Sequence, residues 1–333
     1  MSKLEIAADA LDRPRAIVVG CGRLGKRHLQ GLVGMPTSID ITAVDVSQNA
    51  LDSCRQFCAG LPNVERHNLC FKNLEQFLQC KHEKFDLCII ASTANGRLDL
   101  ATELTASFEA NFWILEKPVE QSVSRMLRFK DIFEFGSCFV NFARRQMSFY
   151  QAIQNRLSPA GTLEVIASHS TFNIASNISH FIDLVHWWTG ALPNSVNVLG
   201  LEPRWFSSQR EGFFEVNGTI LVRFDDGSSL QITSGNAATN NPINVKTNTG
   251  CVYEIDETTG VFRSENGEEI VGSMELQSTM STDIFALILT NKSCLLTPLH
   301  TAIDCNLMLT DVLLSHWNEY GALRHINDTL PVT

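Results

Sequence analysis

Long apolar runs are missing from this sequence. No segment approaches the run of about 18 apolar residues that a membrane-spanning helix needs. The first thirteen residues, MSKLEIAADALDR, carry acids where a signal peptide has a basic end followed by an apolar stretch. We therefore expect a cytoplasmic protein without a membrane partner.

Basic residues are also scarce, since 26 Lys and Arg face 36 Asp and Glu, for a net charge of -10. A protein that grips nucleic acid through its phosphates needs a basic face, so no nucleic-acid partner is expected. The ten cysteines form no CxxC pair and are dispersed, which favours reduced thiols over a disulfide framework. Cys54 and Cys58 share a helix face, but no second ligand pair follows nearby, so packing is favoured and no metal site is predicted.

With 333 residues, the chain has the length of about two domains. Its first part alternates short apolar runs with helical patterns, which is typical of a parallel sheet. The predicted strands are 16–19, 41–44, one within 64–71, 85–91, 112–115 and 139–142. The later part alternates apolar and polar residues over 162–172, 217–224 and 229–234, with helices predicted at about 177–189, 274–290 and 299–321.

These patterns predict an α/β Rossmann dinucleotide-binding domain over 1–145. They predict an α+β domain with a mostly antiparallel sheet over 146–333; the family resemblance described below implies that this sheet is open and that the domain serves substrate binding and oligomerisation. No Pro/Gly-rich linker separates the halves, so an intimate interface with an active cleft is expected between them.

The strongest local signal is the segment Gly20-Cys21-Gly22-Arg23-Leu24-Gly25, which lies between a predicted strand and an amphipathic helix. Its glycines allow a tight turn and a close approach to a pyrophosphate at the helix N-terminus. Asp45 ends the next strand, where a carboxylate accepts hydrogen bonds from ribose hydroxyls and repels a 2′-phosphate. NAD is therefore the preferred cofactor, and NADP is left open.

A second signal is Glu116-Lys117-Pro118, at the carboxyl end of the strand 112–115. Strands of an open α/β sheet point their carboxyl ends toward the ligand crevice, so Lys117 either points at the reactive end of the cofactor or is a surface lysine that begins a loop. On the later helix, Ser176, His180 and Asp183 share one face at 100° per residue. His180 is either a proton-exchanging group or a core histidine bonded to the backbone, and Asp183 is expected to support the helix.

Together, the GCGRLG turn, the EKP tripeptide and the segment Ser179-His180-x-x-Asp183-Leu184 resemble the glucose-fructose oxidoreductase/inositol dehydrogenase/MocA family, as do 86–92 and 141–145. The family's catalytic lysine and histidine map onto Lys117 and His180. Its usual aspartate is replaced by Ser176. The cofactor site that results comprises Gly20, Gly22, Arg23, Leu24, Gly25, Asp45, Ser92, Thr93, Asn95, Glu116 and Lys117. Supporting roles fall to Ser176 and Asp183, and substrate contacts to Arg97 and Arg145.

The resemblance implies hydride transfer between a nicotinamide and a secondary hydroxyl or keto carbon of a sugar, polyol or sugar derivative. It also implies a homodimer or homotetramer. An ordinary imidazole titrates near neutral pH and needs almost no pKa shift for this role, so His180 is expected to exchange the proton while Lys117 polarises and positions the oxygen. The reverse assignment stays open. Arg97, Arg144 and Arg145 suggest either an anionic substrate or contacts with a cofactor phosphate. The alternatives are a catalytically inactive, nucleotide-sensing regulator of the same fold and a reductase of a conjugated pigment or imine.

Overall fold

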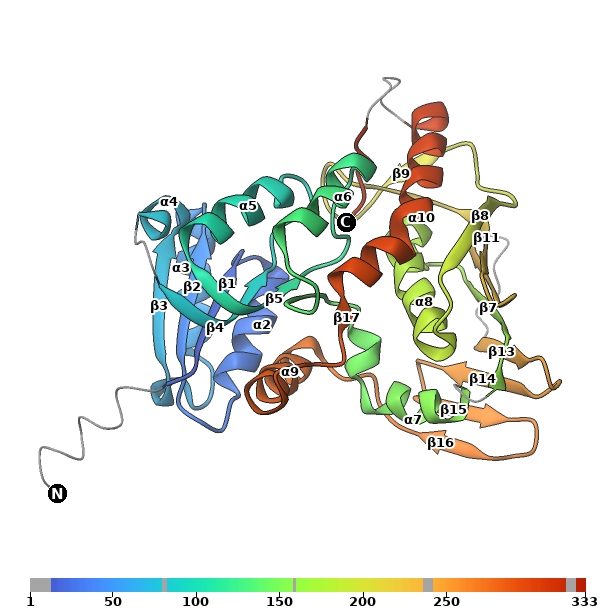
Figure 1. Cartoon of the computed structure of the whole chain (residues 1–333), viewed down its shortest axis with the longest axis horizontal. Coiled ribbons are helices and arrows are strands. Elements are labelled where there is room, and N and C mark those ends of the chain that lie inside the picture. Colours follow the sequence, from blue (N-terminus) through green and yellow to red (C-terminus); the bar gives the residue numbers. More distant parts are fainter. Residues whose placement is uncertain (1–12, 80–82, 158–159, 236–241, 322–327) are drawn as a thin grey trace, which may run out of the picture. The chain divides into compact units, whose positions relative to one another are not determined.

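The computed structural model describes residues 13–79, 83–157, 160–235, 242–321 and 328–333. The chain divides into two compact units (Figure 1). The first unit comprises the chain up to Glu116 together with 131–141 and 275–298, and the second comprises 117–130, 142–274 and 299–333. Most of the acidic start and Cys80 lie outside the described residues.

The first unit contains a seven-stranded sheet in the order β17-β6-β5-β4-β1-β2-β3. Every pair is parallel except β17 with β6. Its strands are β1 (Arg15–Val19), β2 (Asp40–Asp45), β3 (Asn68–Asn73), β4 (Lys84–Ile90), β5 (Glu109–Leu115), β6 (Cys138–Val140) and β17 (Thr297–Pro298). Its helices are α2 (Arg23–Val33), α3 (Gln48–Ala59), the 3₁₀ turn η1 (Val64–Arg66), α4 (Leu74–Leu78), α5 (Arg97–Ser107) and α9 (Gln277–Asn291). The apolar runs of β1 and β4 are almost wholly buried, as a parallel sheet covered on both faces requires.

Helix α9 packs against α2 although some 250 residues separate them. The Thr282 hydroxyl donates to the carbonyl of Gly31 at 2.6 Å, and the Ser281 hydroxyl lies 2.8 Å from Nδ1 of His28. The helix itself is predicted correctly, at about 274–290. A single boundary after residue 145 nevertheless assigns it to the second half. The apolar residues of α9 predict that one face of the helix is buried, but they do not show which of the two units it packs against.

The second unit contains an eight-stranded sheet in the order β16-β15-β14-β13-β7-β12-β11-β8. The pair β7–β12 is parallel and the other pairs are antiparallel. Its strands are β7 (Leu163–His169), β8 (Pro193–Val198), β11 (Gly218–Phe224), β12 (Ser229–Ser234), β13 (Ile243–Thr247), β14 (Val252–Asp256), β15 (Val261–Ser264) and β16 (Glu269–Val271), with a separate pair β9 (Trp205–Ser207) and β10 (Phe214–Val216). The hairpin predicted around Gly227 is present between β11 and β12.

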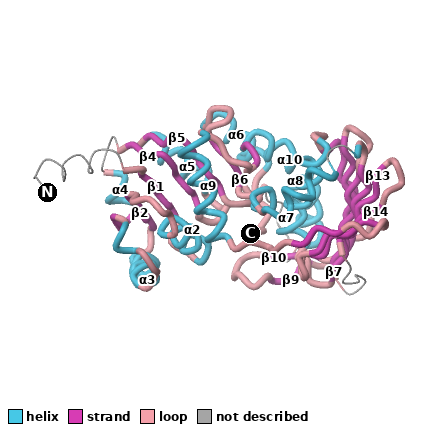
Figure 2. Tube along the Cα trace, turned by 90° about the horizontal axis from the view of Figure 1, so that it is seen from below, coloured by secondary structure: helices cyan, strands magenta, loops and turns pink. Residues whose placement is uncertain are grey.

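The helices of the second unit are α6 (Val123–Ile132), which runs just past the unit's boundary, the 3₁₀ turn η2 (Ala143–Gln146), α7 (Ser148–Leu157), α8 (Ile174–Thr189) and α10 (Leu299–Tyr320). Helix α8 packs on β7 and β12, and α10 on α8 and β8 (Figures 1 and 2). The α/β Rossmann-type unit and the mostly antiparallel α+β unit confirm the predicted fold class. None of the described helices is at once long and apolar enough to cross a membrane.

Candidate active site

The glycine-rich turn joins β1 to α2. Gly20 has φ +103°, which favours glycine, and a Cβ on Gly25 would lie 1.8 Å from the carbonyl oxygen of Gly20. These two positions therefore admit no side chain without moving the backbone. At Gly22 a Cβ would meet no atom within 4 Å. The turn is closely packed on its inner side and open at Gly22, as a loop that admits a ligand must be.

The N-terminus of α2 is uncapped by side chains. Gly22 is its N-cap, makes no side-chain hydrogen bond, and no acidic residue follows in the first turn. Asp45, at the end of β2, accepts a hydrogen bond from the N–H of Cys21 at 2.6 Å and from the N–H of Ser47 at 2.8 Å. This carboxylate therefore holds the glycine-rich turn. The arrangement leaves N–H donors of the first turn available to a phosphate.

The loop after β4 meets the glycine-rich turn. Ala91 N–H donates to the carbonyl of Val19 at 2.8 Å, and a Cβ on Gly20 would lie 2.8 Å from the backbone nitrogen of Ser92. Farther along the same loop, Thr93 and Asn95 are exposed. Arg23 is exposed and Leu24 half-buried at the start of α2. The structure thus brings most of the predicted cofactor residues to the carboxyl ends of β1, β2 and β4.

Glu116 and Arg97, both expected at ligand sites, are buried side chains with hydrogen-bond partners in the first unit. Glu116 is 4% exposed, and its Oε1 receives Nδ2 of Asn141 at 2.6 Å and lies 2.7 Å from Nε2 of His28. Arg97 is 1% exposed and donates to the carbonyls of Glu116 and Ser92, so that it ties together the loops after β5 and β4. The family resemblance implies a cofactor contact for Glu116 and a substrate contact for Arg97, and both residues lie beyond the carboxyl ends of sheet strands.

His28 and Glu116 form a buried pair that the sequence did not reveal. Burial by itself raises the pKa of Glu116, but the hydrogen bond and charge of His28, together with Asn141 and Arg97, bring the pKa below its ordinary value. We expect His28→Ala to lower the free energy of unfolding by about 3 kcal/mol, because it removes one partner of a buried charge. Urea denaturation would measure this loss.

The matched control is Arg27→Ala, on the exposed side of α2, which we expect to change stability by less than about 0.5 kcal/mol. The pH dependence follows from the lowered pKa of Glu116. The stabilisation is present above the ordinary carboxyl pKa of about 4.3 and is lost as the pH falls through the lowered value. The gap between His28→Ala and wild type should therefore narrow in acid. A gap of equal size at all pH values would contradict the role of His28 in lowering the pKa of Glu116.

In the second unit, His180 lies on α8, and Lys117 contacts the first turn of the same helix. The Lys117 Nζ donates to the carbonyl of Ser176 at 3.0 Å. The His180 ring lies edge-on to Phe142 with centroids 5.6 Å apart, and its Nδ1 is buried without a hydrogen-bond partner among the described residues. Burial, with the positive charges of Lys117 and Arg144, lowers the pKa of His180 well below its ordinary value. Because an ordinary imidazole titrates near pH 6.5, this lowered pKa favours the neutral form of His180 at pH 7.

Arg145 and Asp183 pair with each other inside the second unit. The Arg145 Nε and Nη2 donate to the two carboxylate oxygens of Asp183 at 2.8 and 2.7 Å, and both side chains are buried. The pair fastens α8 to η2, so the geometry gives Asp183 a supporting role. It leaves the Arg145 guanidinium bound to a carboxylate of its own chain rather than directed to a substrate.

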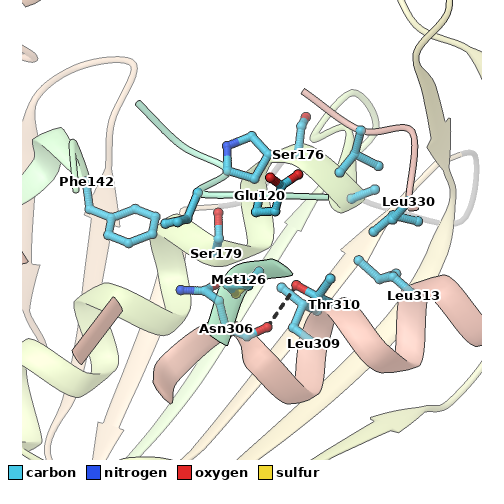
Figure 3. Close-up of a pocket in the computed structure, with 14 residues that line it drawn as sticks. Glu120, Met126, Phe142, Ser176, Ser179, Asn306, Leu309, Thr310, Leu313 and Leu330 are labelled. Carbon is cyan, nitrogen blue, oxygen red and sulfur yellow. Dashed lines mark hydrogen bonds between the residues drawn. The ribbon is translucent and has the colours of Figure 1, made fainter. Parts of the chain in front are cut away.

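Two cavities flank α8, separated by the helix face that carries His180. A cavity of about 30 Å³ lies on one side, lined by Ser176 and Ser179 and, from α10, by Asn306 and Thr310 (Figure 3). A cavity of about 540 Å³ lies on the other side, where α8 contributes Asn177 and Phe181. At 100° per residue, those two side chains lie 60° and 100° from His180. The larger cavity has the size of a small-molecule site.

The wall of the larger cavity carries more negative than positive charge. The Arg144 Nε and Nη2 donate to the two oxygens of Glu257 at 2.6 and 2.9 Å, and Tyr150 Oη donates to Glu257 at 2.5 Å. Burial raises the pKa of Glu257, but the charge and hydrogen bonds of Arg144 and Tyr150 lower it by more. The pKa therefore lies below its ordinary value, which favours the ionised carboxylate. Asp256 adds a second carboxylate to the lining. Arg144 therefore gives no support to an anionic substrate.

Comparisons with known proteins bear on the fold. No protein-family model and no curated protein matches the chain. Among solved structures, a putative myo-inositol dehydrogenase from Sinorhizobium meliloti has TM-score 0.62 and 14% identity over 90% of this chain and 95% of that one. Scyllo-inositol dehydrogenase from Lactobacillus casei, with NAD(H) and scyllo-inositol bound, has TM-score 0.62 and 15% identity over 92% and 97%.

Biliverdin reductase from Synechocystis, in complex with biliverdin and NADP+, also shares the fold. Its TM-score is 0.63 at 14% identity, over 91% of this chain and 98% of that one. The two-unit architecture implied by the family resemblance is thus confirmed by all three structures. At such identities the likeness shows the fold, and the chemistry must be argued from the site itself.

Proposed function

We propose that this protein is a nicotinamide-dependent oxidoreductase of the glucose-fructose oxidoreductase/inositol dehydrogenase/MocA type. The observation that carries the proposal is the turn from Gly20 to Gly25, which is packed against its own backbone inside and open at Gly22. In this proposal, a pyrophosphate approaches Gly22 and the first turn of α2, and Asp45 meets the adenosine ribose. When bound, a nicotinamide supplies or accepts a hydride.

The proposed substrate is an uncharged sugar, polyol or related alcohol that enters the larger cavity of the second unit. Two carboxylates face one guanidinium there, which disfavours an anion. Phe172 and Phe181 offer apolar faces, and Asn177 and Thr258 offer hydrogen-bonding groups, a combination that suits a ring with both C–H and O–H surfaces.

Lys117 and His180 are the proposed catalytic residues. Neutral His180 accepts the hydroxyl proton during oxidation, and its lowered pKa makes its protonated form a strong acid for the reverse reaction. Lys117 polarises and positions the reacting oxygen. Because His180 lies on α8 and Lys117 donates to a carbonyl of its first turn, this helix sets the distance between the two side chains.

The proposal is tested by titrating the purified chain with NADH and with NADPH and following cofactor fluorescence. We expect NADH to bind about tenfold more tightly or better, because Asp45 repels a 2′-phosphate. Asp45→Asn retains an acceptor for Cys21 N–H without the charge, and should narrow this ratio. Tighter binding of NADPH would overturn the NAD preference. Failure of both cofactors to bind would overturn the oxidoreductase proposal and favour a regulator that lacks this chemistry.

A further inference from the structure

Glu215 is a buried carboxylate to which the proposed mechanism assigns no role. It lies in β10, is 2% exposed, and its Oε2 accepts a hydrogen bond from the N–H of Ala175 at 3.0 Å. The N–H and the hydroxyl of Ser176, the next residue, both donate to the carbonyl of Asn173, at 3.2 Å each. The N-cap of α8, Asn173, makes no side-chain hydrogen bond to the helix. A distant strand thus supplies the acceptor for the first turn of α8.

Lys117 reaches the same turn. Its Nζ donates to the carbonyl of Ser176 at 3.0 Å, and Ser176 directly follows Ala175, whose N–H donates to Glu215. Burial raises the pKa of Glu215, while the polar groups of Ser176 and Ala175 and the charge of Lys117 lower it in part. The ammonium and the carboxylate therefore bind adjacent residues of the same helical turn.

Helix capping alone does not account for a carboxylate at this position. A neutral Ser, Thr or Asn side chain satisfies first-turn N–H groups without the cost of burying a charge. A buried carboxylate is stable when a positive charge lies near it, and Lys117 brings one to the residue next to the one that Glu215 binds. In the neighbouring strand β9, the residue that pairs with Glu215 is the uncharged Phe206. The N–H of Phe214, beside Glu215 in β10, donates to the carbonyl of Pro331, which is also uncharged.

We propose that Glu215 is the counter-charge of Lys117 and its positioning residue, and that it keeps the lysine protonated through the first turn of α8. Two other titratable groups lie near this turn. His180 follows Ser176 by four residues on α8, and the charge of Arg144 lowers the pKa of His180. His316 bonds instead to Trp205 of β9. Combined with the proposed function, a protonated Lys117 is the group that polarises the oxygen, and the proton acceptor is His180.

The test uses the full chain and does not need a substrate. Trace acetylation with acetic anhydride, read by mass spectrometry, reports the fraction of Lys117 that is unprotonated at each pH. In Glu215→Gln we expect half-labelling of Lys117 at a pH about one unit lower than in wild type, a roughly tenfold faster reaction at fixed pH, because a nearby negative charge is removed. Glu215→Asp retains the charge and should stay near wild type.

The matched control is Glu120→Gln, because Glu120 is another buried carboxylate of the second unit but pairs with Arg125 at 3.3 Å. It should leave Lys117 labelling unchanged. If Glu215→Gln does not fold, the reciprocal variant Lys117→Met is used, and the Glu215 carboxyl is followed by ¹³C NMR. Its titration should move to higher pH on loss of the positive charge.

An unchanged labelling midpoint in folded Glu215→Gln, or an unmoved Glu215 titration in Lys117→Met, would overturn the assignment and leave Glu215 as a helix cap. Neither measurement involves hydride transfer or cofactor. A failure here is therefore distinguishable from a failure of NADH to bind.

Discussion

Replacing Lys117 with methionine is expected to lower turnover by about 10² to 10⁴-fold, the usual contribution of a positioned acid–base or polarising group. Methionine keeps much of the apolar stem but cannot donate to the Ser176 carbonyl or polarise a substrate oxygen. The measurement is the change in absorbance of the nicotinamide with the neutral sugar or polyol that gives the fastest wild-type rate.

Lys246→Met is the control for this variant. Lys246 is an exposed lysine of β13 in the same unit, so its loss should leave turnover within about twofold. If Lys117→Met retains more than about a tenth of wild-type turnover, Lys117 is not central to the chemistry. The shape of the pH profile adds information, since the variant should still depend on the neutral imidazole of His180.

Gly22→Ala and Gly25→Ala should separate binding from folding. At Gly22 the backbone has φ −68° and a Cβ meets nothing within 4 Å, so alanine should fold normally. It should nonetheless weaken NADH binding about 100-fold, because the methyl group occupies the space proposed for the pyrophosphate. At Gly25 the Cβ would strike the carbonyl oxygen of Gly20, so that variant should lose about 1 to 3 kcal/mol of stability as well as binding.

Gly200→Ala is the control, because Gly200 is also open and is not in the left-handed region, but lies outside the glycine-rich turn. It should leave NADH binding and stability unchanged. Fluorescence titration and thermal unfolding on the same samples give both quantities. Wild-type affinity in folded Gly22→Ala would place the dinucleotide elsewhere, or nowhere, on this chain.

Much of the fold follows from local patterns. The apolar strand before Gly20, the carboxylate at Asp45 and the hairpin at Gly227 each lie where short-range rules place them. Such features depend on backbone geometry within a few residues. They are therefore readable without knowing what the rest of the chain does.

The side chains that pair over long distances were not readable in this way. The His28 ring hydrogen-bonds to Glu116, the Tyr150 hydroxyl donates to Glu257, and the backbone N–H of Ala175 donates to Glu215. The members of each pair are far apart in the sequence, and no local pattern connects them. For the same reason, the sequence suggests Arg97 and Arg145 as substrate contacts. It does not show that Arg97 donates to backbone carbonyls or that Arg145 pairs with the buried Asp183.

The packing of α9 on α2 also has a consequence in time. Residues 275–298 complete the first unit with a helix and with strand β17 beside β6. A ribosome must therefore translate most of the second unit, up to residue 274, before the first unit can cover this face of α2 and pair its last strand. Until then, the α2 residues that α9 covers stay exposed in the nascent chain, and such exposure favours aggregation or the binding of a chaperone.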